Sequence, residues 1–152
     1  MSETVEKAFS IQKIYTQDIS FESPNAPGIF TSEFQPQLGV DLNVESKQLE
    51  EGIYHVVVRV TATTKVEEQT AFLCEVEQAG IFTLAGFSDA EMGYMLGVQC
   101  PNVLFPYARE AVSDLVTRGG FPQLLLEPVN FESIYTEHVQ QASAAKESVT
   151  EQ

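Results

Sequence analysis

Four segments in the first half of the chain alternate between apolar and polar residues, and no other feature constrains the fold as strongly. From Phe9 to Glu22 the odd positions are mostly apolar, with Ile14 as the exception, and the segments 38–44, 54–62 and 69–84 also alternate. Alternation with a period of two is typical of strands that bury one face. Because short polar connections separate these segments, we predict an antiparallel sheet of about four strands in hairpin or Greek-key order.

A helix with clear start and stop signals follows this region. Pro106 suits a first helical turn, where the missing N–H is not needed, and apolar residues then recur at helical spacing towards Arg118. A cation in the last turn, followed by Gly119 and Gly120, favours termination there. The arm that follows, residues 121–128, is too apolar for a solvated loop and too interrupted by proline for a central strand. We therefore expect it to cover an apolar surface.

Two further helices flank this one in the sequence. Ser88 and Glu91 have the spacing of a capping box and start a short helix that Gly97 can end. Asn130 can cap a last helix that begins at Phe131. Strands first and helices later is the order of an α+β domain, so we predict helices packed on one face of the sheet.

The length and the ends of the chain define the expected domain. A chain of 152 residues is long enough for one domain with a real core, which we place at residues 9–142. We expect a flexible N-terminus at 1–8 and a disordered tail at 143–152, where apolar periodicity is absent. The N-terminal residues contain no apolar run of signal-peptide length, and no stretch of about 18 apolar residues occurs anywhere. This pattern predicts a cytoplasmic protein without direct membrane insertion.

The chain is strongly acidic. Eight basic and 22 acidic side chains give a net charge of −14, which argues against nucleic acid and anionic membrane surfaces as partners. A basic partner is favoured, although solubility alone would also explain such a charge.

Carboxylates gather on two of the predicted strands. Asp18 and Glu22 share one strand face at a separation of roughly 13 Å, which is wide for paired-carboxylate catalysis but suits a contact surface. Leu73, Glu75 and Glu77 share a face of the fourth predicted strand. The pattern alone favours a solvated sheet face for both groups of carboxylates.

The sequence contains no catalytic arrangement, so we predict no enzyme activity, cofactor or metal. His55 lies among valines in a predicted strand, His138 lies on the last helix, and Cys74 and Cys100 have no zinc-ligand spacing. A glycine-rich phosphate loop and a nucleophile elbow are also absent. A hot-dog-like thioesterase is the best rival fold, but it would need a carboxylate or histidine on the buried face of the long helix, and that face is apolar.

Three separated motifs resemble the SecB family of protein-export chaperones. They are IYTQDISFESPNAP at residues 14–27, TAFLCEV at 70–76, and CPNVLFPYAR with RGGFPQLLLEPVNF within 100–131. The resemblance covers about residues 9 to 140. It implies an ATP-independent holdase that binds unfolded precursor proteins, keeps them translocation-competent and delivers them to the SecA ATPase. A SecB-like chaperone of a toxin–antitoxin system would have the same fold and is the alternative.

The resemblance also implies a contact surface for SecA. Asp18, Glu22, Leu73 and Glu75 match the family positions at which the basic, zinc-bearing C-terminal segment of SecA docks. These four matches favour the export chaperone over the toxin–antitoxin version. Glu77 departs from the neutral residue expected at its position and would add charge to the surface.

A client-binding groove and an oligomer are further implications. Seven apolar residues match the family's client track: Phe34, Val40, Leu42, Phe72, Leu124, Leu126 and Tyr135. Taken singly, each fits a core position better, because apolar residues in an alternating pattern normally face inward. The sheet and main helix carry more apolar surface than one helix can cover, which favours oligomerisation. The family forms a homotetramer, a dimer of dimers, and Cys74, Val76 and Gln78 match positions at its interface.

Overall fold

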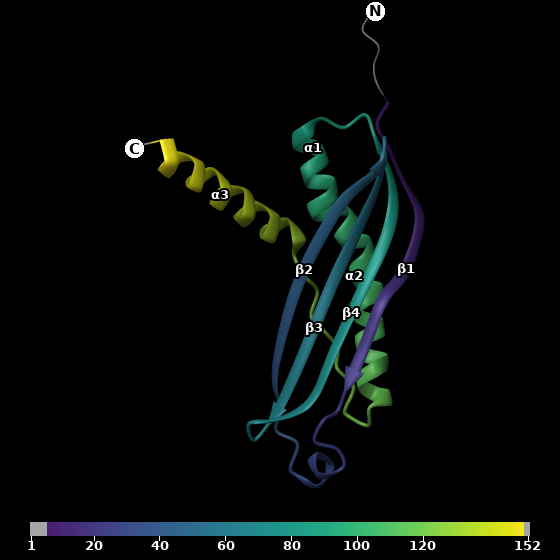
Figure 1. The fold of residues 1–152 in the computed structure, drawn as a ribbon, viewed down its shortest axis with the longest axis vertical. Helices are drawn as coiled ribbons and strands as arrows, with labels where there is room; N and C mark the ends of the chain where they lie inside the picture. Colours follow the sequence, from purple (N-terminus) through teal and green to yellow (C-terminus); the bar gives the residue numbers. More distant parts are fainter. Residues whose placement is uncertain (1–5, 151–152) are drawn as a thin grey trace, which may run out of the picture.

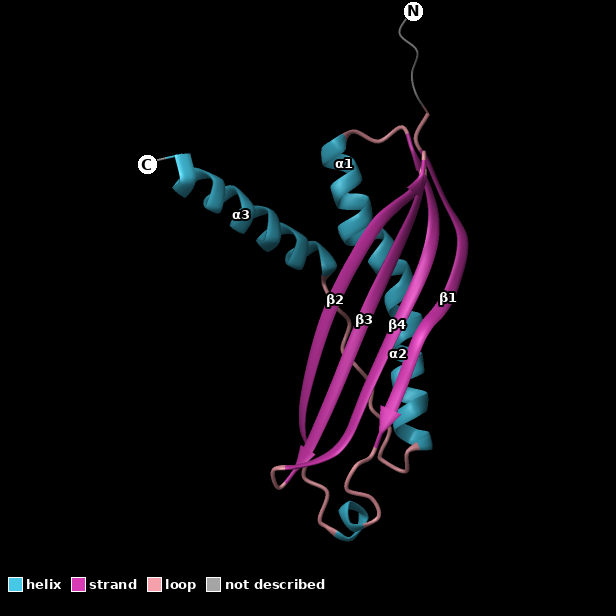
Figure 2. Ribbon diagram, viewed as in Figure 1, coloured by secondary structure: helices cyan, strands magenta, loops and turns pink. Residues whose placement is uncertain are grey.

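A single antiparallel sheet with helices on one face forms the body of the protein. The computed structural model describes the backbone of residues 6–150 and the side chains of residues 6–142. The strands are β1 (Ala8–Glu22), β2 (Gln37–Glu50), β3 (Ile53–Val66) and β4 (Gln69–Ala85). The helical elements are η1 (Gly28–Thr31), α1 (Asp89–Tyr94), η2 (Met95–Gln99), α2 (Cys100–Arg118) and α3 (Phe131–Thr150), as Figures 1 and 2 show.

The strand order is that of a Greek key. β2, β3 and β4 follow one another through short turns, and β1 lies beside β4, so the order across the sheet is β1-β4-β3-β2. All neighbouring strands are antiparallel. The predicted α+β class, the antiparallel sheet of four strands and the Greek-key order are therefore confirmed.

Two bulges in β1 change which side chains face the helices. The register shifts between Ile11 and Lys13 and again between Thr16 and Asp18. Each bulge inserts one residue and reverses the alternation, so the stretch between them has the opposite parity. Ile14 consequently packs against the core, whereas Tyr15 contacts His55 on the other face. The sequence pattern grouped Tyr15 with the core residues and treated Ile14 as the exception, and the structure corrects both assignments.

The core lies between the inner face of the sheet and α2. α2 packs across β3 and β4, as Figure 1 shows. Leu104, Ala108 and Val112 of α2 are fully buried, as is Val58 of β3. A Cβ atom built on Gly80 of β4 would lie 3.0 Å from a methyl carbon of Leu104, so helix and strand approach closely here. Within residues 6–150, no helix covers the opposite face of the sheet (Figure 1).

The main helix begins earlier than the sequence predicts. α1, η2 and α2 follow one another without a break, so Gly97 does not end a helix and Pro106 lies inside α2. The amide of Cys100 donates to the carbonyl of Met95, five residues earlier, which makes one π-helical turn just before Pro101. Leu104 is fully buried on the N-terminal side of Pro106, so packing against the sheet outweighs the usual cost of an internal proline.

The predicted helix ends are otherwise confirmed. Ser88 and Glu91 form the complete capping box of α1. Asn130 Oδ1 accepts a hydrogen bond of 3.0 Å from the amide of Ser133 and caps α3. At the end of α2, the amide of Gly119 donates to the carbonyl of Leu115 at 2.9 Å, and Gly120 has a φ of 90° that suits glycine.

The arm and α3 complete the fold. Phe121 and Leu126 of the arm are buried, which confirms that it covers apolar surface, and α3 then leaves the body of the protein, as Figure 1 shows. α3 remains helical to Thr150, through most of the predicted tail at 143–152, and residues 151–152 lie outside the described part of the chain. Most of the predicted flexible N-terminus, 1–8, also lies outside it. The domain boundaries stay a prediction.

Candidate functional site

The uncovered face of the sheet carries a cluster of carboxylates. Asp18 of β1 lies opposite Glu77 of β4, and Glu22 lies opposite Leu73. Glu75 points to the same face between these two pairs. The four residues expected to contact a basic partner, Asp18, Glu22, Leu73 and Glu75, therefore lie together on adjacent strands, and we call them the acidic surface.

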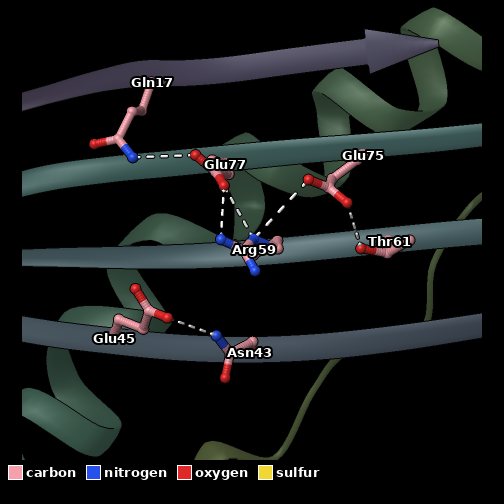
Figure 3. Close-up of polar contacts among 7 residues, drawn as sticks. All are labelled: Gln17, Asn43, Glu45, Arg59, Thr61, Glu75 and Glu77. Atoms are coloured by element: carbon pink, nitrogen blue, oxygen red, sulfur yellow. Dashed lines mark hydrogen bonds and ion pairs between the residues drawn. The ribbon is translucent and has the colours of Figure 1, made fainter.

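Arg59 of β3 lies beside the acidic surface and pairs with Glu77 (Figure 3). Its Nε and Nη2 atoms lie 3.0 and 2.9 Å from Glu77 Oε1, while Gln17 Nε2 donates to Glu77 Oε2 at 3.0 Å. The hydrogen bond from Gln17, together with the hydrogen bond and charge of Arg59, lowers the pKa of Glu77 although partial burial opposes this. Glu77 therefore stays ionised and is held between two donors.

Glu75 has a looser environment. Thr61 Oγ1 donates to its Oε2 at 3.2 Å, and Arg59 Nε lies 4.0 Å from its Oε1, beyond hydrogen-bond distance. Carboxylate oxygens of Asp18, Glu75 and Glu77 lie within 4.8 Å of one another, so Arg59 reduces the repulsion among three negative charges. Sequence reasoning missed Arg59, because only the register of β3 against β4, with Arg59 opposite Glu77, reveals the pair.

Further along the same face, Tyr15 and His55 form a second polar pair. The Tyr15 hydroxyl and His55 Nε2 lie 2.7 Å apart and are hydrogen-bonded. Burial, and then the nearby charge of Lys47, lowers the pKa of His55, so the imidazole is neutral at pH 7.

An apolar groove lies on the other side of the sheet, between β2 and the arm. Its volume is about 470 Å³. The residues that line it are Leu38, Val40, Leu42, Val60, Phe105, Leu125, Leu126, Glu127, Pro128 and Val129. Val40 is 46% exposed and Leu125 is 69% exposed, so the groove is open to solvent. Of the seven predicted groove residues it contains Val40, Leu42 and Leu126.

Phe34 and Phe72 belong to a separate aromatic cluster around Phe121. The ring centroids of Phe34, Phe72 and Phe30 lie 6.1, 5.0 and 5.1 Å from that of Phe121. Phe34 and Phe30 are 36% and 48% exposed, whereas Phe72 is buried at 2%. The cluster thus presents two aromatic side chains to solvent over a buried base. Sequence reasoning missed Phe30, which follows a turn and has no strand pattern around it.

The other two predicted groove residues lie elsewhere. Leu124 is partly buried against the core. Tyr135 of α3 packs beside η2 and α1, where its ring makes an edge contact with Tyr94 at 6.1 Å. The structure therefore divides the predicted track into a groove, an aromatic cluster and two separate positions.

The three residues predicted at an interface are buried within the chain. Cys74, Val76 and Gln78 are 1%, 0% and 3% exposed, on the face of β4 that α2 covers. Thr16 Oγ1 donates to Gln78 Oε1 at 3.1 Å, and burial raises the pKa of the Cys74 thiol to about 11. Any effect of these residues on assembly must therefore be indirect, through the elements that pack on them, which include α2 and β1.

Known proteins resemble this chain in sequence and in fold. A family model described as preprotein translocase subunit SecB matches residues 2–142. The protein-export protein SecB of Hydrogenovibrio crunogenus is 73% identical over 146 residues, which cover 95% of this chain and 98% of that protein. The protein of the same name in Methylococcus capsulatus is 52% identical over 145 residues, covering 95% and 94%.

A solved structure has the same fold. A SecB-like chaperone of Mycobacterium tuberculosis, in complex with a peptide from an antitoxin, superimposes with a TM-score of 0.66 at 18% identity, covering 80% of this chain and 90% of the other. At this identity the likeness concerns the fold alone. Among the described residues, no helix is both long and apolar enough to cross a membrane.

Proposed function

Because this chain belongs to the SecB family, we propose that it is an ATP-independent chaperone of protein export, which holds unfolded precursor proteins in a translocation-competent state and delivers them to the SecA ATPase. The observation that carries this proposal is the separation of two surfaces on one sheet. An open apolar groove lies on the helix side, and an acidic surface lies on the uncovered side.

The groove and the aromatic cluster are the proposed client-binding region. Val40 and Leu38 are each 46% exposed and offer apolar contacts without a fixed shape. β2 is also an edge strand, so an extended client segment beside it can pair with main-chain groups. Neither apolar contacts nor main-chain hydrogen bonds require a particular client sequence, so both support binding of many precursors.

The acidic surface is the proposed contact for SecA. Asp18, Glu22 and Glu75 attract a basic segment at long range, and Leu73, which is 37% exposed, offers an apolar contact among them. The expected partner is the basic, zinc-bearing C-terminal segment of SecA. Association driven by exposed charges should weaken as salt is added.

Assembly and location are parts of the same proposal. Phe9, Ile11 and Ile19 of the edge strand β1 are 40 to 46% exposed, which leaves apolar surface for another copy to cover. This supports a homotetramer built as a dimer of dimers. A protein that meets precursors before their export works in the cytoplasm.

Two alternatives are less well supported. A chaperone of a toxin–antitoxin system is suggested by the structural neighbour, which binds an antitoxin peptide. However, the relatives at 73% and 52% identity are named protein-export proteins. A thioesterase would need a polar catalytic group on the buried face of α2, where Leu104, Ala108 and Val112 lie.

The proposal is tested by reversing charge at Asp18 and Glu22. Asp18→Lys with Glu22→Lys should weaken binding of the SecA segment more than tenfold and leave the affinity for an unfolded precursor unchanged, as measured by calorimetry. The same reversal at Glu132 and Glu137, which are exposed on α3, is the matched control. Equal loss of both activities would contradict two separate surfaces.

A further inference from the structure

We propose that Glu77 is a positioning residue, which holds Arg59 away from Glu75 and so keeps Glu75 free for the basic partner. This inference rests on the proposed function, because the acidic surface defined above must be the docking site. It goes beyond that function by giving opposite roles to two neighbouring carboxylates. Glu75 contacts the partner, and Glu77 neutralises an internal cation.

The bonds of Glu77 leave little of its carboxylate for a partner. Glu77 Oε1 lies 3.0 and 2.9 Å from Arg59 Nε and Nη2, and Glu77 Oε2 accepts a hydrogen bond of 3.0 Å from Gln17 Nε2 (Figure 3). The Glu77 side chain is 13% exposed, whereas that of Glu75 is 39% exposed. A partner on this face therefore meets Glu75 first.

Arg59 lies between the two carboxylates and can pair with either. Its Nε atom is 3.0 Å from Glu77 and 4.0 Å from Glu75, so a small rotation of the guanidinium would replace one pair with the other. An Arg59–Glu75 pair would neutralise a contact residue and place a cation where a basic partner must dock. Like charges brought together in this way oppose association.

Removal of the Glu77 side chain should therefore weaken docking through Arg59. Without Glu77, the guanidinium has Glu75 as its nearest anionic partner and competes with the basic segment. Removal of Arg59 as well should restore the affinity, because the competitor is gone. If Glu77 instead contacts the partner directly, Arg59→Gln will recover no more affinity in the Glu77→Ala background than it adds to the parent chain, because the lost contact is not replaced.

A double-mutant cycle separates the two models. The variants are Glu77→Ala, Arg59→Gln and both together, and the probe is the zinc-loaded C-terminal segment of SecA, titrated by calorimetry at low salt. We expect Glu77→Ala to weaken binding about tenfold, and Arg59→Gln alone to strengthen it by at most about twofold. In the Glu77→Ala background, Arg59→Gln should recover nearly all of the loss, a coupling of about fivefold or more.

Matched variants make every outcome decisive. Glu50→Ala removes the same charge from an exposed position on β2, where Glu50 lies opposite Ile53, and should change the affinity less than about twofold. Precursor binding should be the same in all variants. Any fall in melting temperature from the lost Glu77 hydrogen bonds should persist in the double variant while its affinity recovers, which excludes a merely structural effect. Recovery no greater than the effect of Arg59→Gln alone, with Asp18→Asn and Glu75→Gln still weakening binding, would overturn this inference alone. If those two variants bind normally, the acidic surface itself is wrong and the inference falls with it.

Discussion

At the scale of single residues, Gly119 at the end of α2 shows how closely the last helical turn approaches β1. A Cβ atom built on Gly119 would lie 2.2 Å from Cζ of Phe21, an impossible contact. Gly119→Ala should therefore force the Phe21 ring away from Phe72, on which it stacks with a centroid distance of 5.8 Å. We expect this change to lower the free energy of unfolding by about 2 kcal/mol. Urea denaturation followed by circular dichroism measures the change.

Gly28 provides the control for this prediction. It precedes the aromatic cluster, and a Cβ atom added there would have nothing within 4 Å. Gly28→Ala should change the free energy of unfolding by less than about 0.5 kcal/mol. Equal stability of the two variants would mean that the contact between α2 and Phe21 is relaxed in solution.

Individual positions differ in how far the sequence predicts them. Period-two alternation correctly places Glu75 and Leu73 on one face, because β4 has no bulge between them. Alternation gives the wrong face for Tyr15, because a bulge depends on how β1 pairs with β4 and no residue type in β1 predicts it. The role of Arg59 is missed for a related reason. Its partner Glu77 is 18 residues away and becomes its neighbour only through the register of two strands.

At the scale of elements, α2 shows why helix boundaries are harder to predict than helices. Pro106 and Gly97 are ordinary stop or start signals in an isolated helix. In the folded chain, Val98 and Leu104 lie on either side of Cys100 and are buried against the rest of the core. Local propensity predicts the element, but the apolar surface of the sheet decides its length.

The attachment of α3 is the second element-scale feature, and it depends on one aromatic side chain. Cβ atoms built on Gly93 and Gly97 would lie 2.7 and 2.8 Å from atoms of Tyr135, so the Tyr135 side chain fills the space that these glycines leave. Tyr135→Ala should release the first turns of α3 and raise amide hydrogen exchange at residues 131–142 about tenfold or more. The strands should keep their protection, because Tyr135 does not pack on the sheet centre.

Val139 is the matched control on the same helix. It is 46% exposed, so Val139→Ala removes apolar surface without removing the contact with η2. Exchange in α3 should then change little. If both variants exchange alike, Tyr135 does not anchor the helix.

At the scale of the whole molecule, the sheet separates the two proposed binding surfaces by alternation alone. In β2, Val40 and Leu42 point to the groove while Asp41 and Asn43 point to the uncovered face. A client and a basic partner can therefore bind the same four strands without touching each other. The sequence predicts this division well, because β2 is regular over these residues, but it does not predict that Phe34 and Tyr135 lie outside the groove.

The groove yields the final prediction, since its role can be separated from that of the core. Val40→Thr combined with Leu42→Asn keeps side chains of similar size and removes apolar contact, so the dissociation constant for an unfolded precursor should rise about tenfold. Leu49→Asn, at a position 47% exposed on β2 outside the residues that line the groove, is the control and should bind normally. Fluorescence anisotropy with a labelled precursor measures the affinity, and light scattering measures the assembly.

Because Leu42 also touches the core, a changed mass or a lower melting temperature in the double variant would show a structural defect, and Val40→Thr alone then tests the groove. Normal precursor binding by Val40→Thr and by the double variant would exclude the groove as the client site and leave the aromatic cluster as the remaining candidate.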